Sequence, residues 1–319
     1  MRTYILRRLL FNVPVVLLIV AAVFTMIRIT PRDVVEMMLE DAQVSGAEKQ
    51  RLYNQIRGEL GLDQPIHVQF SRYLWKMVHA DMGKSYYHGR PVLAEIGARL
   101  PTTIQLGLVA IFFGMMVAIP LGVLGALYQD TWVDYVSRVV SVFSLSIPSF
   151  WTATLVIVVP AILWHYAPPT SYSPPWENLT ENLRHVLPAA LILGSNLMGS
   201  IARMTRSAVL EVIRQDYIRT ARAKGLREFV VVQRHVLKNA MIPVFTLLGL
   251  VLSILIGGTA IMEIVFNIPG VGSLTVNAVN FSDFPQLQAN VLFIATWIVT
   301  ANLLVDIGYA WFDPRIRYR

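Results

Sequence analysis

Six apolar runs that are free of Asp, Glu, Lys and Arg mark candidate membrane spans in the chain of 319 residues. About 20 apolar residues in a helix span the hydrocarbon core of a bilayer, and lipid leaves an open segment no other way to satisfy its backbone hydrogen bonds. The runs cover residues 9–27, 100–129, 139–176, 185–202, 239–262 and 284–305. This pattern predicts an all-α polytopic membrane protein with six transmembrane helices.

The first and third runs carry additional signals at their ends. Arg7 and Arg8 precede the first run, as in a cleaved signal peptide. That run is longer than a signal core and no A-x-A cleavage site follows it, so we expect a retained helix. In the third run, a cluster of prolines begins at Pro168 and predicts that the helix ends near Trp164.

Residues 28–99 interrupt the apolar pattern with a polar segment, which predicts a small helical domain between the first two spans. The letters SGAE form a capping box that predicts a helix over 45–58. Pro65 precedes a second helical stretch, and Pro91 suits the first turn of an amphipathic helix that runs to Arg99. The segment is too polar to span a membrane and shows no catalytic constellation.

Composition agrees with this class and excludes several chemistries. The chain is 55% hydrophobic and only 15% charged, whereas soluble domains are about 25% charged. It has no cysteine, which excludes disulfides, thiol nucleophiles and Cys-based metal sites. The motifs H-E-x-x-H and G-x-S-x-G are also absent, so a membrane-embedded enzyme is disfavoured.

The basic residues are distributed unequally between the two sides of the predicted topology. Sixteen Lys and Arg fall on the side of the two termini, nine of them within 203–238, whereas the short loops of the other side hold only Arg184. The positive-inside rule then places both termini in the cytoplasm and residues 28–99 outside. The external segment is long and nearly neutral, so its translocation does not violate the rule.

The fourth run contains small residues at helical spacing. Gly194, Ser195, Gly199 and Ser200 lie where they let helix backbones approach closely, which favours helix packing. A second interpretation is that the polar Ser195 and Asn196 face an aqueous pathway. The two interpretations are compatible on different faces of one helix.

Residues 203–240 form the only long segment on the predicted cytoplasmic side. Val209, Ile213, Tyr217 and Ala221 recur at i+4 and predict one apolar helical stripe. Gly225 ends the helix, because glycine readily adopts the left-handed conformation. An apolar face then resumes at Phe229, Val230, Val236 and Leu237. This helix, stop and return suits insertion into a groove on a partner, although topogenic charges or a helix lying on anionic lipid remain alternatives.

Four stretches resemble the permeases of bacterial ABC transporters, in the dipeptide, oligopeptide and nickel branch of binding-protein-dependent import. These are RMTRSAVLEVIRQDYIRTARAKGL at 203–226, ELGLDQP at 59–65, VFNIPGVGSL at 265–274 and NLLVDIGYAWFDPRIR at 302–317. The chain departs from the wider superfamily at Arg219, where a glutamate is usual. It departs from the family itself at residues 30–34, which read TPRDV in place of Pro-Gly-Asp-Pro. Ala221 and Gly225 keep the positions of the second alanine and the glycine in the superfamily pattern Glu-Ala-Ala-x-x-x-Gly.

The resemblance implies a coupling helix that docks on an ATP-binding subunit. Its residues here are Asp216, Tyr217, Arg219, Thr220, Ala221, Arg222, Ala223, Lys224 and Gly225. The chain lacks a G-x-x-x-x-G-K-[ST] loop, so ATP and Mg²⁺ belong on partner subunits and no cofactor is expected in this chain. The implied partners are a second related permease, two ATP-binding subunits, an extracytoplasmic substrate-binding protein and the lipid bilayer, with no nucleic acid.

The domain organisation follows from these predictions. It comprises residues 1–27 (the cytoplasmic N-terminus and first helix), 28–99 (the extracytoplasmic scaffold), 100–312 (a five-helix permease core with the coupling loop 203–240) and 313–319 (the cytoplasmic tail). The protein is expected in the bacterial inner membrane as a transport subunit without catalytic residues or a metal site.

The stretch after the fifth run is a candidate external gate. Phe266 and Ile268 are suited to plug the exit, Pro269 and Gly270 to form a turn, and Gly272 to loosen it. An ordinary tight turn between two helices is the alternative.

Two acidic residues at the membrane margins are further candidates, because acids in a membrane are costly. Glu263 binds a substrate amino group or caps the interfacial boundary. Asp306 pairs with Arg203 or Arg206.

A secondary transporter or channel is the competing function, with Glu263, Asp306, His165 and His185 as an ion relay. It predicts ionisable residues near mid-bilayer in several spans, and the sequence has almost none there. Short peptides are the expected substrate, with nickel chelates, glutathione and oligosaccharides left open. The sequence leaves open whether the second permease is a copy or a paralogue.

Overall fold

The computed structural model describes residues 2–29, 35, 36, 39, 46–59, 61–166, 169 and 171–312, with side chains described at all of these except 2–9, 26–29, 59 and 306–312. Helices make up 81% of the structure. Within the described residues the only extended pairing is an isolated bridge between Lys84 and Pro91. The predicted all-α class is confirmed.

The chain divides into two compact units, each built from two separate stretches of sequence. The core unit comprises Thr102–Gly272 and Thr300–Arg319, and the N-terminal unit comprises Arg2–Pro101 and Ser273–Val299. Long helices run from one unit into the other. The predicted domain boundary between residues 99 and 100 therefore lies inside a continuous helix. The helix α5 (Val92–Leu127) begins directly after Pro91, as predicted, but does not end at Arg99.

In the N-terminal unit, α3 (Ala47–Glu59) and α4 (Ile66–Val78) match the two predicted helices, while Ser45 of the capping box lies outside the described residues. The helix α1 (Arg2–Ile29) packs against α4 through aromatic rings. The ring of Phe24 lies 5.1 Å from that of Phe70 and 5.6 Å from that of Tyr73.

A buried carboxylate joins two further parts of the N-terminal unit. Asp283 lies between α13 (Val271–Asn280) and α14 (Phe284–Phe312). Its side chain accepts hydrogen bonds from the Ser85 hydroxyl at 2.5 Å and from the Tyr86 backbone N–H at 3.2 Å. This carboxylate therefore ties the segment before α5 to the turn before α14.

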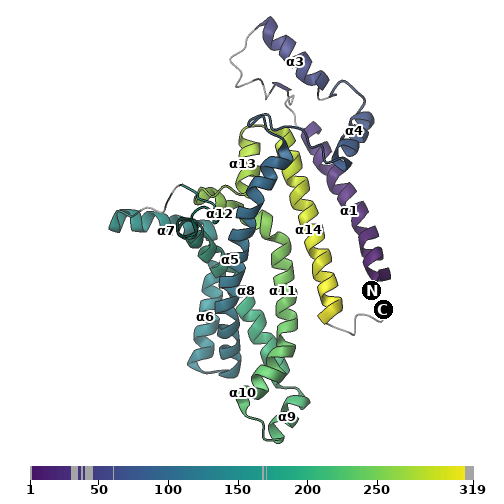
Figure 1. The fold of residues 1–319 in the computed structure, drawn as a ribbon. Helices are drawn as coiled ribbons and strands as arrows, with labels where there is room; N and C mark the ends of the chain where they lie inside the picture. Colours follow the sequence, from purple (N-terminus) through teal and green to yellow (C-terminus); the bar gives the residue numbers. More distant parts are fainter. Residues whose placement is uncertain are drawn as a thin grey trace. The chain divides into compact units, whose positions relative to one another are not determined.

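The core unit is a bundle centred on one long helix, α8 (Leu179–Ile213), which is flanked by α6 and α11 (Figure 1). The remaining elements follow in chain order. They are α6 (Trp132–Ser146), α7 (Ser149–Trp164), α9 (Asp216–Ala223), α10 (Glu228–Val231), the π-helical turn η1 (Val232–Val236), α11 (Leu237–Gly258) and α12 (Ala260–Val265).

The small residues of α8 allow its neighbours to pack at backbone distance, which confirms the packing interpretation. A Cβ atom on Gly194 would lie 2.6 Å from the main-chain oxygen of Ala110 in α5. A Cβ atom on Gly199 would lie 2.5 Å from the main-chain oxygen of Ser141 in α6. Glycine is therefore required at both positions for α8 to contact α5 and α6 this closely.

The helix α6 has its polar face inside and its apolar face outside. Asp134, Ser137 and Ser141 are buried, whereas Trp132, Val139 and Phe143 are exposed. A soluble helix shows the opposite arrangement, because its apolar stripe faces the core. An outward apolar face is suited to contact with lipid.

Four described helices are long and apolar enough to cross a membrane, and a bent pair adds a fifth. The four segments are Val92–Leu127, Leu179–Ile213, Glu228–Gly258 and Phe284–Val305. In α1 the apolar stretch recorded is the shorter Leu10–Thr25. The protein is polytopic, and the predicted count of six rests on counting α1 as well.

The prediction of one continuous helix for the third span is wrong, because the structure divides this span into α6 and α7. The segments α6 and α7 meet at an angle of 90°. Pro148 disfavours a helical conformation for the residue before it, and Ile147 is extended, with φ −92° and ψ 122°. The predicted end at Trp164 is confirmed, since His165 is left-handed, with φ 52°.

Substituting Gly194 should weaken the contact between α5 and α8. In Gly194→Ala, the new methyl group meets a main-chain oxygen, which cannot move without shifting a helix. We expect the purified chain to lose about 1–3 kcal/mol of stability, measured as a lower temperature of half-maximal aggregation in detergent. Gly97→Ala is the matched control, since its Cβ atom would meet nothing within 4 Å. An equal loss in the two variants would contradict the packing role.

Candidate functional site

The predicted coupling segment folds as a helix, a glycine turn and a second helix, which confirms its predicted shape. After α9 the chain turns at Gly225, which is left-handed with φ +76°. Its N–H donates to the carbonyl oxygen of Arg222 at 2.9 Å. The helix α10 then leads through η1 into α11. We call residues 214–231 the elbow.

The apolar stripe predicted through this segment is not continuous. The helix α8 ends at Ile213, and Gln215 is extended, with φ −72° and ψ 147°. An extended residue shifts the register, so the i+4 spacing does not hold across it. Ile218 is consequently fully buried, and the predicted Tyr217 is exposed with its hydroxyl accepting a hydrogen bond from Asn239 Nδ2 at 2.8 Å.

The inner face of the elbow packs on the ends of the long helices. Ile218 and Ala221 of α9 belong to one buried apolar cluster. Its other buried members come from α5, α8, α10, η1 and α11, namely Ala126, Ala208, Val209, Val231, Val236 and Ala240. The elbow is therefore anchored to α5 and α8 by side-chain packing.

The outer face of the elbow carries exposed charges and two exposed apolar side chains. Arg219 and Lys224 are exposed. Leu226 is 40% exposed and Phe229 is 69% exposed. Of the predicted second apolar face, Phe229 is exposed, whereas Val236 is buried and Leu237 packs against the same cluster. The apolar period alone did not identify Leu226 and Phe229 as surface residues.

An ion pair closes the turn of the elbow. Arg222 donates from Nε to Glu228 Oε2 at 3.1 Å and from Nη2 to Oε1 at 2.6 Å. The hydrogen bond to this carboxylate raises the pKa of the Arg222 guanidinium above its ordinary value. Such a two-point contact holds α9 at a defined angle to α10.

A buried charge cluster joins α6 to α8 near the elbow. Asp134 is fully buried and accepts from Arg206 at 2.6 Å (Nε) and 2.9 Å (Nη2). Arg138 donates to the same carboxylate. Arg206 was one of two expected partners of Asp306, and in the structure it is paired with Asp134. The side chain of Asp306 lies outside the described residues, and Arg203 is exposed.

The predicted gate segment is a tight loop after α12. Asn267 is left-handed, with φ +51°. The N–H of Ile268 donates to the carbonyl oxygen of Glu263 at 2.7 Å, and the N–H of Val271 donates to the Thr103 hydroxyl at 2.8 Å. We call residues 266–272 the loop.

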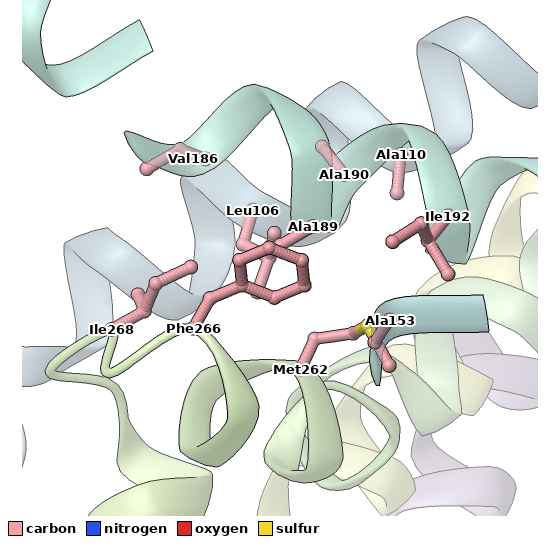
Figure 2. Packing of buried hydrophobic residues seen from close by; sticks show 10 residues of the cluster. All are labelled: Leu106, Ala110, Ala153, Val186, Ala189, Ala190, Ile192, Met262, Phe266 and Ile268. Carbon is pink, nitrogen blue, oxygen red and sulfur yellow. The ribbon is translucent and has the colours of Figure 1, made fainter. Parts of the chain in front are cut away.

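The two apolar side chains of the loop are packed inside their own chain. Phe266 and Ile268 are 5% and 1% exposed and belong to a buried cluster with residues of α5, α7, α8 and α12. Figure 2 shows the Phe266 ring reaching from the loop between α12 and α8 toward Ala189 and Leu106. The loop is thus seated on α5 and α8.

Glu263 is also inside the protein, with no exposed area. Its Oε1 atom accepts hydrogen bonds from the hydroxyls of Thr103 and Thr259, both at 2.8 Å. In this structure it therefore contacts neighbouring hydroxyls and is not accessible to a substrate.

The remaining predicted polar residues bond their own helix. The Ser195 hydroxyl and the Asn196 amide both donate to the carbonyl oxygen of Ile192, at 2.7 and 3.3 Å. Both side chains are half-buried. Among the described side chains, no three His, Asp or Glu residues are grouped in a way that could hold a metal ion.

The elbow and the loop lie at opposite ends of the same two helices (Figure 1). In α5, Leu106 contacts the loop cluster and Ala126 the elbow cluster. In α8, Val186 belongs to the loop cluster and Val209 to the elbow cluster. The roughly 20 intervening residues correspond to about 30–35 Å of helix. The helices α5 and α8 therefore run parallel and connect the two segments across about the thickness of a bilayer core.

Comparison with known families supports a transport role for this arrangement. Residues 118–318 match the family described as the binding-protein-dependent transport system inner membrane component, and residues 1–107 match the N-terminal region of such membrane components. The chain belongs to this family. It is a permease subunit of an ABC importer and a multi-pass inner-membrane protein. The competing secondary-transporter function is disfavoured.

Relatives resemble the permease over its whole length. A Brucella abortus (strain 2308) chain, provisionally named a peptide transport system permease protein, is 38% identical over 100% of both chains. The glutathione transport system permease protein GsiC of Salmonella paratyphi A is 36% identical, and the dipeptide transport system permease protein DppB of Alkalihalophilus pseudofirmus is 34% identical. Both of these alignments also cover 100% of each chain.

A solved structure supports the fold alone. The crystal structure of an amino acid ABC transporter with histidines matches with a TM-score of 0.52 and 12% identity, covering 68% of the permease and 93% of that chain.

Removing one partner of the Asp134–Arg206 pair should destabilise the permease. Arg206→Met leaves a buried carboxylate with a single arginine, and breaking a buried pair costs about 3–5 kcal/mol. We expect the melting temperature of the purified permease to fall by about 5 °C or more. The control is Asp130→Asn. Asp130 is exposed and its distance to Arg138, 3.5 Å, is long for an ion pair, so this substitution should have little effect on the melting temperature. A wild-type melting temperature for Arg206→Met would contradict the role.

Proposed function

We propose that this permease imports short peptides by alternating access, driven by ATP hydrolysis on two ATP-binding subunits. A second related permease and an extracytoplasmic substrate-binding protein complete the assembly. Relatives named for peptide, dipeptide and glutathione transport support the substrate class. The observation that carries the mechanism is that α5 and α8 connect the elbow to the loop.

The energy source lies outside this chain. The sequence has no glycine-rich phosphate-binding loop, so ATP and Mg²⁺ bind to the partner subunits. Closure of those subunits on ATP then shifts the permease toward its outward-open state.

The outer face of the elbow is the docking surface for an ATP-binding subunit. A short amphipathic helix laid in a groove is a common recognition mode. Of the predicted docking residues, Asp216, Tyr217, Arg219, Thr220, Arg222, Ala223, Lys224 and Gly225 are exposed there, whereas Ala221 is buried on the inner face. The exposed Leu226 and Phe229 add apolar contacts to the charges of Arg219 and Lys224.

The proposed topology has six spans with both termini in the cytoplasm. It counts α1 as the first span and the bent pair of α6 and α7 as the third. The excess of Lys and Arg near the elbow and the termini supports this orientation. Residues 28–99 then form the extracytoplasmic scaffold, and the loop faces outward.

The loop is the external gate in this proposal. Phe266 and Ile268 seal the loop against α5 and α8. Pro269 shapes its turn, and Gly270 and Gly272 let the loop approach Glu263 and Ala260 closely. Ser195 and Asn196 remain candidates for the translocation pathway, and Asp306 for an ion pair near the cytoplasmic face.

A substitution at Gly225 tests the docking role. Gly225→Val forces a β-branched residue into a left-handed conformation, whereas Gly225→Asn is tolerated better there. In membranes with all subunits present, we expect Gly225→Val to lower transport of a labelled dipeptide and stimulated ATP hydrolysis about tenfold or more, at a wild-type level of membrane insertion, with Gly225→Asn close to wild type. Unchanged transport in Gly225→Val would contradict coupling through the elbow.

Phe266→Ala tests the gate. Loss of the ring opens a cavity under the loop, so we expect several-fold higher basal ATP hydrolysis in the purified complex without solute. Phe112→Ala is the control, because Phe112 is 67% exposed on α5. A basal rate equal to that of the control would count against the gate.

A further inference from the structure

We infer that Thr103, His185, Thr259 and Glu263 form a polar latch that makes the loop move together with α5 and α8. The residues are positioning residues for the transport cycle. The inference rests on the proposed function, because it explains how movement at the elbow reaches the gate. It assigns roles to Thr103, Thr259 and His185 that apolar periodicity does not reveal.

The Glu263 carboxyl group is the centre of the latch. It accepts hydrogen bonds from two hydroxyl groups, each at 2.8 Å. One belongs to Thr103 in α5, and the other to Thr259, the residue directly before α12. Thr103 in turn accepts the backbone N–H of Val271 at 2.8 Å. All three side chains are at most 1% exposed. A chain of hydrogen bonds thus runs from the loop backbone through Thr103 to Glu263, and hydrogen bonds in such chains strengthen one another.

Two glycines permit this approach. A Cβ atom on Gly270 would collide with the Glu263 carboxyl group. A Cβ atom on Gly272 would lie 2.5 Å from the Cα atom of Ala260 in α12. These glycines therefore serve close contact between the loop and its supporting helix, and neither has a positive φ.

His185 fixes the other end of the loop to α8. Its Nε2 atom lies 2.8 Å from the carbonyl oxygen of Phe266, and the side chain is 1% exposed. A carbonyl oxygen only accepts, so Nε2 is the donor. The loop is consequently held by α5 at Val271 and by α8 at Phe266.

The two attachment points lie on the helices that also carry the elbow. Breaking a latch bond leaves a buried polar group without its partner, which is costly in an apolar interior. The loop therefore cannot lift from α5 and α8 without this cost. Rotation of the two helices moves the loop with them, so the latch transmits the displacement instead of acting as a hinge.

The absence of cysteine in the sequence provides a clean test. Ile268→Cys places the only thiol of this chain at a position that is 1% exposed, and labelling is read on the permease after the subunits are separated. The complete complex, with its ATP-binding subunits, is purified in detergent, and the rate of labelling by a water-soluble maleimide is measured without nucleotide and after trapping with ATP and vanadate. Basal ATP hydrolysis is measured in parallel.

The test variants weaken the latch in this background. Thr103→Val removes the hydroxyl at similar size, and Glu263→Met removes the oxygen that accepts both hydroxyls at similar length. We expect each to raise the labelling rate without nucleotide by roughly five- to a hundredfold, the factor that follows from leaving a buried group unpaired. We also expect them to reduce the difference between the two nucleotide states and to raise basal ATP hydrolysis.

One control keeps the hydroxyl group at residue 103, and the other substitutes an exposed glutamate outside the latch. Thr103→Ser keeps the hydroxyl and should restore slow labelling. Glu177→Met makes the same change at an exposed residue and should behave as the parent. A variant that does not assemble is replaced by His185→Leu, which removes the bond to Phe266 and should also speed labelling.

The results separate the latch from the proposed function. Parental labelling rates in Thr103→Val and Glu263→Met would overturn the latch, even if the thiol responds to nucleotide. Faster labelling in both variants combined with a parental response to nucleotide would also overturn it, because the latch would then be structural only. Labelling that never responds to nucleotide in the parent would instead overturn the gate in the proposed function.

Discussion

The close crossing of α5 and α8 is the constraint on which the rest of the core depends. Gly194 brings the two backbones together, and a Cβ atom there would lie 2.6 Å from a main-chain oxygen of α5. Lipid supplies no hydrophobic force between helices, so close van der Waals packing of this kind stabilises the pair. Because neither helix can slide freely, what is attached at their two ends is mechanically connected.

The polar interactions of the core are consistent with this arrangement. Asp134 and Arg206 join α6 to α8 at the end near the elbow, while Glu263 and His185 act at the end near the loop. Each is buried or half-buried, and each has a hydrogen-bonded partner on a different helix or on the loop. Such groups are expensive in an apolar environment unless paired, and pairing across helices makes their geometry specific. The helix α6 also has its polar residues inside and its apolar residues outside, since its serines at 137 and 141 are buried whereas Trp132 and Phe143 are exposed.

The elbow illustrates a division of roles between two faces. Its inner face is packed against Ala126 and Val209, whereas its outer face exposes Phe229 and several basic residues. The Arg222–Glu228 pair stabilises the angle between α9 and α10. A partner that binds the outer face therefore acts on a part of the chain that is rigidly attached to α5 and α8.

The sequence by itself determined the helical class, most of the helix positions and the family. It also determined the left-handed turn at Gly225, because charge-free runs, capping patterns and glycine stops are local properties of the chain. It did not determine that α6 and α7 bend at Pro148, or that the chain extends at Gln215 and so breaks the predicted stripe. A proline can kink or end a helix, and neighbouring packing decides which.

Only the tertiary structure decided the partners of the charged and polar residues. Glu263 meets Thr103 across 160 positions and Asp134 meets Arg206 across 72, and no periodicity encodes such distant contacts. Gly270 and Gly272 were assigned to a turn from their sequence, yet the fold uses them for close approach to Glu263 and Ala260. The reason is that local propensity describes a residue's own backbone, whereas pairing and steric clearance depend on which helices the whole chain brings together.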